Sequence, residues 1–426
     1  MEVTNPKRKL YSPQENTWYP YYAGYSPEFV KDVITNLNID KSSLIMDPWN
    51  GSGTTTSVSM NMGLNCLGFD INPVMVLVAK SRCLNQSIQQ SMISLGKDII
   101  DQASYLQDGE YIIEPLETWF KPESAQIFRN LERAIRHILI NNDEDVLPYY
   151  MDLNRISSLA AFYYVALFRT LRDELEVFKT SNPTWIKKPK NSEDHLSVDP
   201  MKINASFLSY ITKMSMLIPK DTNLPVALIK EASSINIPID SATIDAVITS
   251  PPYCTRIDYA IATLPELALM GCSLNEDVKK LRLQMIGSPV IDKKTPERQI
   301  EWGASCIGFL KQVEEHSSVA SSTYYLKNYL QYFDLMFNSL SEINRTLKES
   351  GLCTLVIQES YYKNIFLDLP GIITEMTKEF SWKQISCQKF GIKNSMVDLN
   401  KRAKIHQIKN NAQENVLIFR HASDQC

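Results

Sequence analysis

The segment Ser250-Pro251-Pro252-Tyr253 has the residue types that best suit catalysis, and it follows an apolar, strand-like run. Two consecutive prolines hold the backbone in a rigid, extended turn. A rigid turn presents its carbonyl oxygens in fixed directions, which suits a site that must hold an amine. The Ser250 hydroxyl and the Pro251 carbonyl are therefore candidates to accept hydrogen bonds from both N–H groups of one amine.

An exocyclic amine on a nucleobase is a poor nucleophile because its lone pair is delocalised into the ring. Two hydrogen bonds from its N–H groups would draw the nitrogen toward a tetrahedral geometry and free that lone pair. Tyr253 is suited to stack on a nucleobase that has been flipped out of a nucleic-acid duplex. No histidine that could serve as a catalytic nucleophile lies next to the segment. Cys254 is the nearest thiol, and we expect it to have no chemical role. The alternative is a proline-stiffened surface loop that carries an aromatic residue.

A second candidate site is the glycine-rich turn Asn50-Gly51-Ser52-Gly53-Thr54, placed between a predicted strand and a predicted helix. Glycine permits unusual dihedrals and a close approach to a ligand, and the first N–H groups of a helix favour an anion such as a carboxylate. Asp47 precedes the turn and could pair with an amino group, while Asp70 could accept hydrogen bonds from two ribose hydroxyls. The alternative is a tight turn with two acids that cap helices.

This turn differs from two common nucleotide-binding motifs. It lacks the Gly-Lys-Ser/Thr of a P-loop, and it is not a complete Gly-x-Gly-x-x-Gly. The second difference argues against an enzyme that uses a nicotinamide cofactor.

The elements that must position these two turns alternate between helix and strand. We predict strands at 43–46, 66–69, 224–230, 244–249, 352–358, 382–389 and 415–419, and helices at 27–37, 54–62 and 324–347, with Gly351 as the C-cap of the last. The pattern predicts an α/β fold with a mostly parallel sheet and an antiparallel last strand.

A long segment between the two motifs has a different character. Residues 125–140 and 156–171 have helical periodicity, strand signals are few, and 182–191 resembles an exposed loop. We therefore predict a catalytic domain in two parts, 1–84 and 224–426, separated by a helical insertion at 85–223. A further insertion is predicted at 271–320, and either insertion is a candidate for target recognition.

Composition limits the class of protein. The 426 residues carry a net charge of −4, so any nucleic-acid contact must come from local basic patches. The eight cysteines and five histidines are dispersed, which argues against a metal site and a disulfide framework. With no signal peptide and no apolar run able to span a bilayer, we expect a soluble cytoplasmic protein that does not partner a membrane.

Together the two motifs resemble those of the S-adenosylmethionine-dependent amino-methyltransferases of DNA, specifically the cytosine-N4 type. Asp47-Pro48-Trp49-Asn50-Gly51-Ser52-Gly53-Thr54 resembles the family's cofactor turn, with Trp in place of the usual Phe, and Thr249 to Tyr253 match its catalytic motif. Gly68 to Pro73 resemble the ribose-binding strand end, and 414–419 the last strand. The resemblance spans roughly 17–80, 225–270 and 324–420, and it implies a Rossmann-like methyltransferase fold.

The resemblance also implies roles for particular residues. It assigns catalysis to Ser250, Pro251, Pro252 and Tyr253. It assigns cofactor binding to Tyr22, Asp47, Pro48, Gly51, Ser52, Gly53, Thr54, Asp70, Ile71, Asn72, Glu231 and Thr249. Tyr22 belongs to an N-terminal segment, 19–29, that resembles the one closing over the methionine moiety in this family.

Serine as the first residue of the catalytic motif favours cytosine N4, because Asp or Asn is more usual in the adenine-N6 and RNA guanine-N2 enzymes that resemble this fold. The implied partner is double-stranded DNA, with proteins of a restriction or phage-defence system as further candidates. Adenine-N6 methylation, RNA methylation and a catalytically silent binding subunit are the alternatives.

Three groups of basic residues are candidates for phosphate contacts. They are Lys187, Lys188 and Lys190 in the predicted loop, Arg256 just after the catalytic turn, and Lys401, Arg402 and Lys404 near the C-terminus. Solvated surface charge is the alternative for each group.

Overall fold

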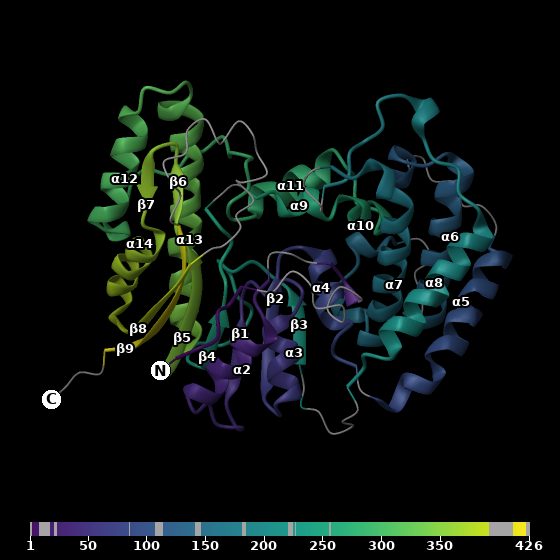
Figure 1. Ribbon diagram of the computed structural model, residues 1–426, viewed down its shortest axis with the longest axis horizontal. Helices are drawn as coiled ribbons and strands as arrows, with labels where there is room; N and C mark the ends of the chain where they lie inside the picture. The colour runs from purple at the N-terminus through teal and green to yellow at the C-terminus, as the bar shows by residue number, and fades with distance from the viewer. Residues whose placement is uncertain are drawn as a thin grey trace.

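A seven-stranded sheet forms the centre of the computed structural model (Figure 1). The structure describes residues 2–7, 18–20, 24–84, 86–106, 114–140, 146–180, 185–219, 225, 227–254, 257–391 and 412–422. The strands are β1 (Leu44–Asp47), β2 (Asn65–Asp70), β3 (Ala227–Glu231), β4 (Ile244–Thr249), β5 (Leu347–Gln358), β8 (Trp382–Gly391) and β9 (Gln413–His421). Their order across the sheet is β3-β2-β1-β4-β5-β9-β8.

Strand directions confirm the predicted sheet. The pairs β3·β2, β2·β1, β1·β4 and β4·β5 are parallel, whereas β9 is antiparallel to both β5 and β8. Helices follow β1, β2 and β4 along the chain, whereas β3 leads to β4 without a helix, and together these elements form a Rossmann-like arrangement. All seven strands predicted from the sequence are present, with ends that differ by a few residues.

Alternation of side chains along the strands explains why both faces of the sheet are covered. Ile45 and Ile248 pack on one face, while Met46 and Val247 pack on the other. Successive residues of a strand point to opposite faces of the sheet. A strand whose side chains are apolar on both faces must therefore be covered on both sides.

Helices cover the two faces. One face carries α2 (Pro27–Asn36) and α3 (Thr54–Asn61), and the other carries α12 (Ala304–Glu315), α13 (Leu326–Thr346) and α14 (Leu369–Met376). Ser26 caps α2 by accepting a hydrogen bond from the backbone N–H of Phe29, and Pro27 occupies the first turn. A small hairpin, β6 (Ser360–Tyr362) and β7 (Ile365–Leu367), lies between β5 and α14 along the chain.

The segment between the two motifs is helical. Figure 1 shows α5 (Met92–Tyr105), α6 (Pro122–Leu139), α7 (Ser158–Glu174) and α8 (Pro200–Ser215) grouped beyond α4 (Pro73–Lys80), on the right of the view. The division into domains at 84/85 and 223/224 stays a prediction.

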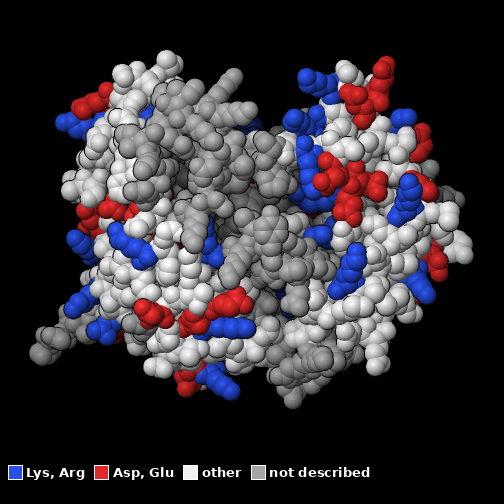
Figure 2. Space-filling model, in the orientation of Figure 1, with Lys and Arg blue, Asp and Glu red and all other residues white. Residues whose placement is uncertain are grey.

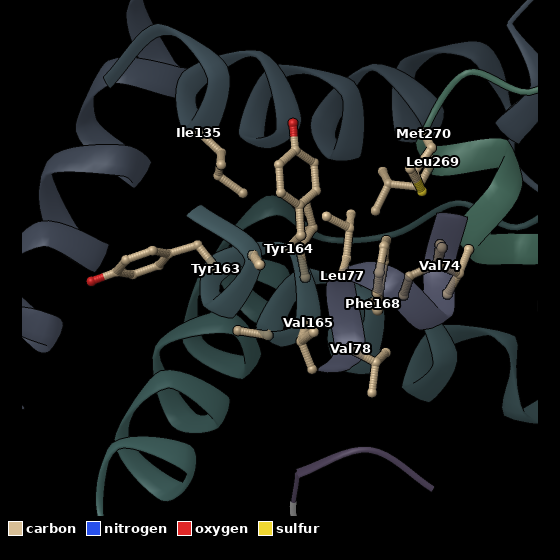
Figure 3. Close-up of a cluster of buried hydrophobic side chains, with 14 of the residues drawn as sticks. Val74, Leu77, Val78, Ile135, Tyr163, Tyr164, Val165, Phe168, Leu269 and Met270 are labelled. Atoms are coloured by element: carbon tan, nitrogen blue, oxygen red, sulfur yellow. The ribbon is translucent and has the colours of Figure 1, made fainter. Parts of the chain in front are cut away.

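Apolar contacts join this group of helices to α4 and to the helix that follows the Ser250–Tyr253 turn. In Figure 3, Leu77 from α4, Tyr164 and Phe168 from α7, and Leu269 from α10 (Leu264–Leu269) lie in one buried cluster. Because α10 comes soon after the catalytic turn, the helical segment packs directly against the chain that leaves that turn.

Two short helices complete the described fold near the catalytic turn. They are α9 (Tyr259–Ala262) and α11 (Glu276–Gln284). Among the helices that the structure describes, none is long and apolar enough to cross a membrane.

One prediction from the sequence is wrong. Gly351 was expected to cap the helix at 324–347, but α13 ends at Thr346 and the chain continues directly into β5. The strand pairing shifts register here, from Ile244↔Leu347 to Ala246↔Leu352. A Cβ on Gly351 would lie 2.7 Å from the side chain of Leu347, so this glycine permits a tight irregularity in the strand.

Candidate active site

The two sequence motifs meet at one edge of the sheet. The glycine-rich turn follows β1 and the catalytic turn follows β4, and these two strands are parallel neighbours. The carboxyl ends of parallel strands share an edge, where open α/β sheets bind ligands. A single pocket of about 950 Å³, including space open to solvent, lies there. It is lined by Gly24, Tyr25, Asp47, Pro48, Trp49, Asn50, Gly51, Ser52, Thr54, Asp70, Ile71, Asn72, Met75, Ala232, Ser233, Ser234, Ser250, Pro251, Pro252, Tyr253, Tyr259, Thr263, Gln284, Met285 and Ile286.

Glycines shape the turn after β1. Gly51 and Gly53 have φ of +49° and +79°, a region that other residues adopt only with strain. A Cβ on Gly53 would also lie 2.9 Å from the Cβ of Ala79 in α4. Gly68 in β2 makes room in the same way, because a Cβ there would lie 2.4 Å from Nδ2 of Asn50. The backbone of this turn can therefore approach a ligand closely.

Asp47 joins the cofactor turn to the catalytic strand. Its carboxylate accepts hydrogen bonds from the hydroxyls of Thr249 (2.5 Å), Thr55 (2.7 Å) and Tyr25 (3.0 Å) and from the backbone N–H of Trp49 (3.1 Å). Burial raises the pKa of this carboxyl, and the hydroxyl donors oppose that rise. The Thr55 and Tyr25 hydroxyls also lie within hydrogen-bond distance of each other and of the carbonyl of Ile248, so their single protons are shared among these acceptors. The proposed contact with a methionine amine stays a prediction.

Asp70 lies at the end of β2, where the sequence places it for ribose binding. Its two oxygens accept one hydrogen bond each, from the backbone N–H groups of Gly51 (2.8 Å) and Asn72 (2.8 Å). Each oxygen keeps a second acceptor position, so the carboxylate can accept hydrogen bonds from two further hydroxyls. Burial raises the pKa of Asp70 to about 6, with a smaller contribution from the charge of Asp47, while the backbone N–H groups of Asn72, Gly51 and Ile71 oppose the rise.

Unsatisfied polar atoms around the pocket fit a bound polar ligand. Among the described residues, Nε1 of Trp49, Nδ2 of Asn50 and Oγ of Ser52 are buried without a hydrogen-bond partner. Buried polar groups normally have partners, and clustered exceptions call for an explanation. Because all three residues line the pocket, a cofactor with several polar groups is a suitable occupant.

The catalytic turn is held from two strands and a helix. The Ser250 hydroxyl donates a hydrogen bond to the carbonyl of Val356 in β5 (3.1 Å), which leaves the oxygen's lone pairs as acceptors. Tyr332 of α13 donates to the carbonyl of Pro252 (3.0 Å). The Tyr253 hydroxyl donates to Oε1 of Glu414 in β9 (3.1 Å). These three bonds fix the turn as a unit.

Acceptors for an amine remain at this turn. Within the described chain, no hydrogen bond is made to the carbonyl of Pro251, whereas the carbonyl of Pro252 is occupied by Tyr332. The Ser250 hydroxyl oxygen and the Pro251 carbonyl thus keep acceptor capacity, and their joint role in holding an amine stays a prediction.

The far wall of the pocket comes from the predicted insertion at 271–320. Gln284 ends α11, and Met285 and Ile286 follow it. Gly287 comes next with φ of +77°, and a Cβ there would lie 2.9 Å from the carbonyl oxygen of Tyr253. Arg282 forms an ion pair of 2.6 Å with the buried Asp258 and so ties α11 to α9. This wall is packed closely against the catalytic turn.

Most residues predicted for the site line this pocket, and a few do not. Thr249 is fully buried, and its hydroxyl binds Asp47. Glu231 pairs with Asp70 in the sheet register but is exposed beyond the pocket wall. Their roles in cofactor binding stay predictions. Tyr22 lies outside the described residues, although its neighbours Gly24 and Tyr25 line the pocket.

The basic residues predicted to contact DNA are only partly described. Lys187, Lys188 and Lys190 are exposed in the segment after Trp185, away from the pocket lining. Arg256, Lys401, Arg402 and Lys404 lie outside the described residues. On the described surface in Figure 2, Lys and Arg are interspersed with Asp and Glu and form no continuous basic field. The phosphate contacts stay predictions.

Several pocket residues were not predicted from the sequence. Tyr25 had a local signal, because it immediately precedes the capped helix α2 in the aromatic N-terminal segment. Tyr259, Gln284, Met285 and Ile286 had none, because they reach the pocket only through the packing of α9 and α11. Nowhere in the described chain do three or more His, Cys, Asp or Glu side chains gather in a way that could hold a metal ion.

Part of this chain is similar to a known family of DNA-modifying enzymes. A model of the DNA methylase family that groups adenine-N6 and cytosine-N4 enzymes matches residues 4–81, which contain the cofactor turn and Asp70. S-adenosylmethionine is the methyl donor of this family.

Three Type II methyltransferases are similar to this chain over longer stretches. The Type II methyltransferase M.BsoBI of Geobacillus stearothermophilus is 24% identical, over 88% of this chain and 73% of its own length. M.MvaI of Kocuria varians is 21% identical over 85% of this chain and 81% of its own length. M.AvaI of Nostoc sp. is 23% identical over 67% and 61% respectively. These alignments extend the likeness well beyond the segment that the family model matches.

Proposed function

We propose that this chain, a DNA methyltransferase of the adenine-N6/cytosine-N4 family, modifies the exocyclic N4 amine of cytosine. The observation that carries the proposal is the hydrogen bond that the Ser250 hydroxyl donates to the carbonyl of Val356. Because this bond uses the hydroxyl proton, the Ser250 oxygen can act toward a substrate only as an acceptor. Serine at this position is typical of the cytosine-N4 enzymes that the motif resembles. The Type II relatives further support a role as the modification enzyme of a restriction-modification system.

The pocket has a suitable place for the cofactor. The Gly51–Gly53 turn, Asp70 and the unsatisfied atoms of Trp49, Asn50 and Ser52 would hold S-adenosylmethionine. When bound, this cofactor supplies an electrophilic methyl group whose departure leaves a neutral thioether. No strong base is therefore needed before the transfer.

The chain's own residues then act on the amine. Ser250 Oγ and the Pro251 carbonyl would accept hydrogen bonds from the two N–H groups and localise the lone pair on nitrogen. Tyr253 would stack on the cytosine after it leaves the DNA helix. Because the turn is already held by Val356, Tyr332 and Glu414, the acceptors need little rearrangement during the reaction.

One experiment tests the base and the substrate together. The purified chain is incubated with labelled S-adenosylmethionine and either unmethylated plasmid DNA or total RNA, and the digested nucleosides are separated. We expect label in N4-methylcytosine from DNA. Label in N6-methyladenine would keep the class and overturn the base. Label only in RNA, or no transfer to either substrate, would overturn the proposal.

A further inference from the structure

Glu414 is a buried glutamate directly behind the catalytic turn, and no sequence motif assigns it a role in the reaction. It lies near the start of β9, is 3% exposed, and accepts a hydrogen bond from the Tyr253 hydroxyl (3.1 Å). Its other oxygen, Oε2, is buried and has no hydrogen-bond partner among the described residues. A half-satisfied buried carboxylate is costly to keep, so it requires an explanation.

Other buried acids of the fold are better satisfied. Glu359 directly follows the last residue of β5, Gln358. Its carboxylate accepts a hydrogen bond from the backbone N–H of Gln413 (2.9 Å) and lies 3.7 Å from the Lys389 ammonium. Glu132 is held by Arg129, Arg136 and Tyr164. Glu414 has the tyrosine of the catalytic turn as its single described hydrogen-bond partner. Burial raises the pKa of Glu414, and the charge of Lys7 and the hydrogen bond from Tyr253 oppose that rise.

We infer that Glu414 is a positioning residue for methyl transfer, which fixes the ring of Tyr253 and makes its face more electron-rich. This inference rests on the stacking role given to Tyr253 above. A hydroxyl that donates to a carboxylate forms a charge-assisted hydrogen bond, which is stronger than a neutral one. It also shifts electron density toward the phenol ring. Burial raises the pKa of the Tyr253 hydroxyl, and the charge of Glu414 adds to that rise.

We expect the electron-rich ring of Tyr253 to stabilise the transition state of methyl transfer more than the bound substrate. As the amine attacks the methyl group, positive charge develops on the nitrogen attached to the cytosine ring. An electron-rich aromatic face attracts a cation, so stacking on Tyr253 strengthens as the charge grows. An interaction that is stronger in the transition state than in the ground state raises kcat without improving binding.

Two single variants and their combination test this inference. Glu414→Gln keeps an acceptor oxygen but removes the charge, while Tyr253→Phe keeps the ring but removes the hydroxyl. We expect each to lower kcat on unmethylated plasmid DNA by about fivefold to tenfold, the gap between a charge-assisted and a neutral hydrogen bond. The KM for DNA and the Kd for S-adenosylmethionine should stay within about twofold of wild type. The double variant should lose no more than either single variant, because both remove the same interaction.

Glu359→Gln is the matched control, since it neutralises a buried glutamate of the same sheet region that does not contact the catalytic turn. It should keep the wild-type kcat. A Glu414→Gln variant with full kcat, or one whose loss lies in KM or cofactor affinity, would overturn the inference. So would losses that multiply in the double variant. Failure of the proposed function can be distinguished from failure of this inference, because the wild-type chain would then produce a methylated nucleoside other than N4-methylcytosine, or none.

Discussion

The Thr249 hydroxyl donates a 2.5 Å hydrogen bond to Oδ1 of Asp47, and this bond ties the catalytic strand β4 to the cofactor strand β1. Both side chains are almost completely buried. The residue before the catalytic serine is thus fixed to the residue at the start of the cofactor turn. This link fixes the relative position of the two turns that line the pocket.

Thr249→Val should therefore lower both stability and activity. Removing the hydroxyl deprives a buried carboxylate oxygen of a donor, at a cost of about 1–3 kcal/mol. Urea unfolding measures the stability, and methylation of plasmid DNA measures the activity. Thr249→Ser, which keeps the hydroxyl, is the control and should restore most of both. Equal unfolding free energies for the valine and serine variants would contradict the role of this bond.

Ser250→Ala should abolish most of the transfer and leave cofactor affinity unchanged. The variant removes one of two acceptors that hold the amine, and loss of a preorganised hydrogen-bonding group in an active site costs about 10²-fold in kcat. Single-turnover methylation and calorimetric binding of S-adenosylmethionine separate the two effects. A variant that transfers methyl groups at the wild-type rate would remove Ser250 from the mechanism.

Asp70 should make cofactor binding depend on pH. Its pKa is raised to about 6, so the carboxylate becomes protonated as pH falls through that value and loses acceptor capacity. Affinity for S-adenosylmethionine should fall with it. In Asp70→Asn, affinity should be low at every pH and this dependence should vanish. A wild-type affinity that stays constant from pH 5 to pH 8 would contradict the ribose contact.

The raised pKa of Asp70 affects folding stability in the opposite direction from cofactor affinity: stability falls, rather than rises, with increasing pH. A carboxyl whose pKa is higher in the folded state than in the unfolded state binds its proton more tightly when folded, so its contribution to stability falls as pH rises from about 4 to about 6. Urea unfolding of the cofactor-free chain at these two pH values, with Asp70→Asn as the reference, isolates this contribution. A contribution that grows with pH in this window would contradict the raised pKa.

Gly53→Ala should destabilise the cofactor turn. The left-handed conformation costs a non-glycine residue roughly 1–2 kcal/mol, and the new methyl would also press on Ala79. Gly63 is the matched control, because it has φ of +85° but no atom within 4 Å of an added Cβ. Gly63→Ala should show the conformational cost alone and leave cofactor binding intact. The difference between their unfolding free energies measures the contact with Ala79.

Arg172→Met should be strongly destabilising. Arg172 forms an ion pair with Glu266 of α10, and Glu266 is completely buried and also accepts a hydrogen bond from Tyr19 (2.9 Å). Removing the arginine leaves a buried carboxylate without its counter-ion, which typically costs about 3–5 kcal/mol. Lys179→Met, which removes an exposed ion pair with Glu176, should change stability by less than about 1 kcal/mol. Similar losses in both variants would contradict this account.

The sequence alone predicted the parts of this protein that depend on local pattern. Apolar runs followed by Asp47 and Asp70 marked two strands and their acidic ends, and the Ser250–Tyr253 segment marked the turn after a third. These signals are local because strand burial, proline rigidity and glycine dihedrals are properties of short segments. Gly351 shows the weakness of such signals, since the same residue serves a helix cap or a strand irregularity equally well.

Only the tertiary structure decided which distant residues complete the site. Glu414 reaches Tyr253 because β9 inserts beside β5, and Gln284 reaches the pocket because α11 is tied to α9 by Arg282 and Asp258. Asp47 was expected to bind a ligand, yet its described hydrogen bonds serve the chain itself, one of them from Thr249. The contacts of Glu414 with Tyr253 and of Asp47 with Thr249 join residues more than a hundred positions apart. Packing and hydrogen-bond satisfaction, which are properties of the whole fold, select such contacts.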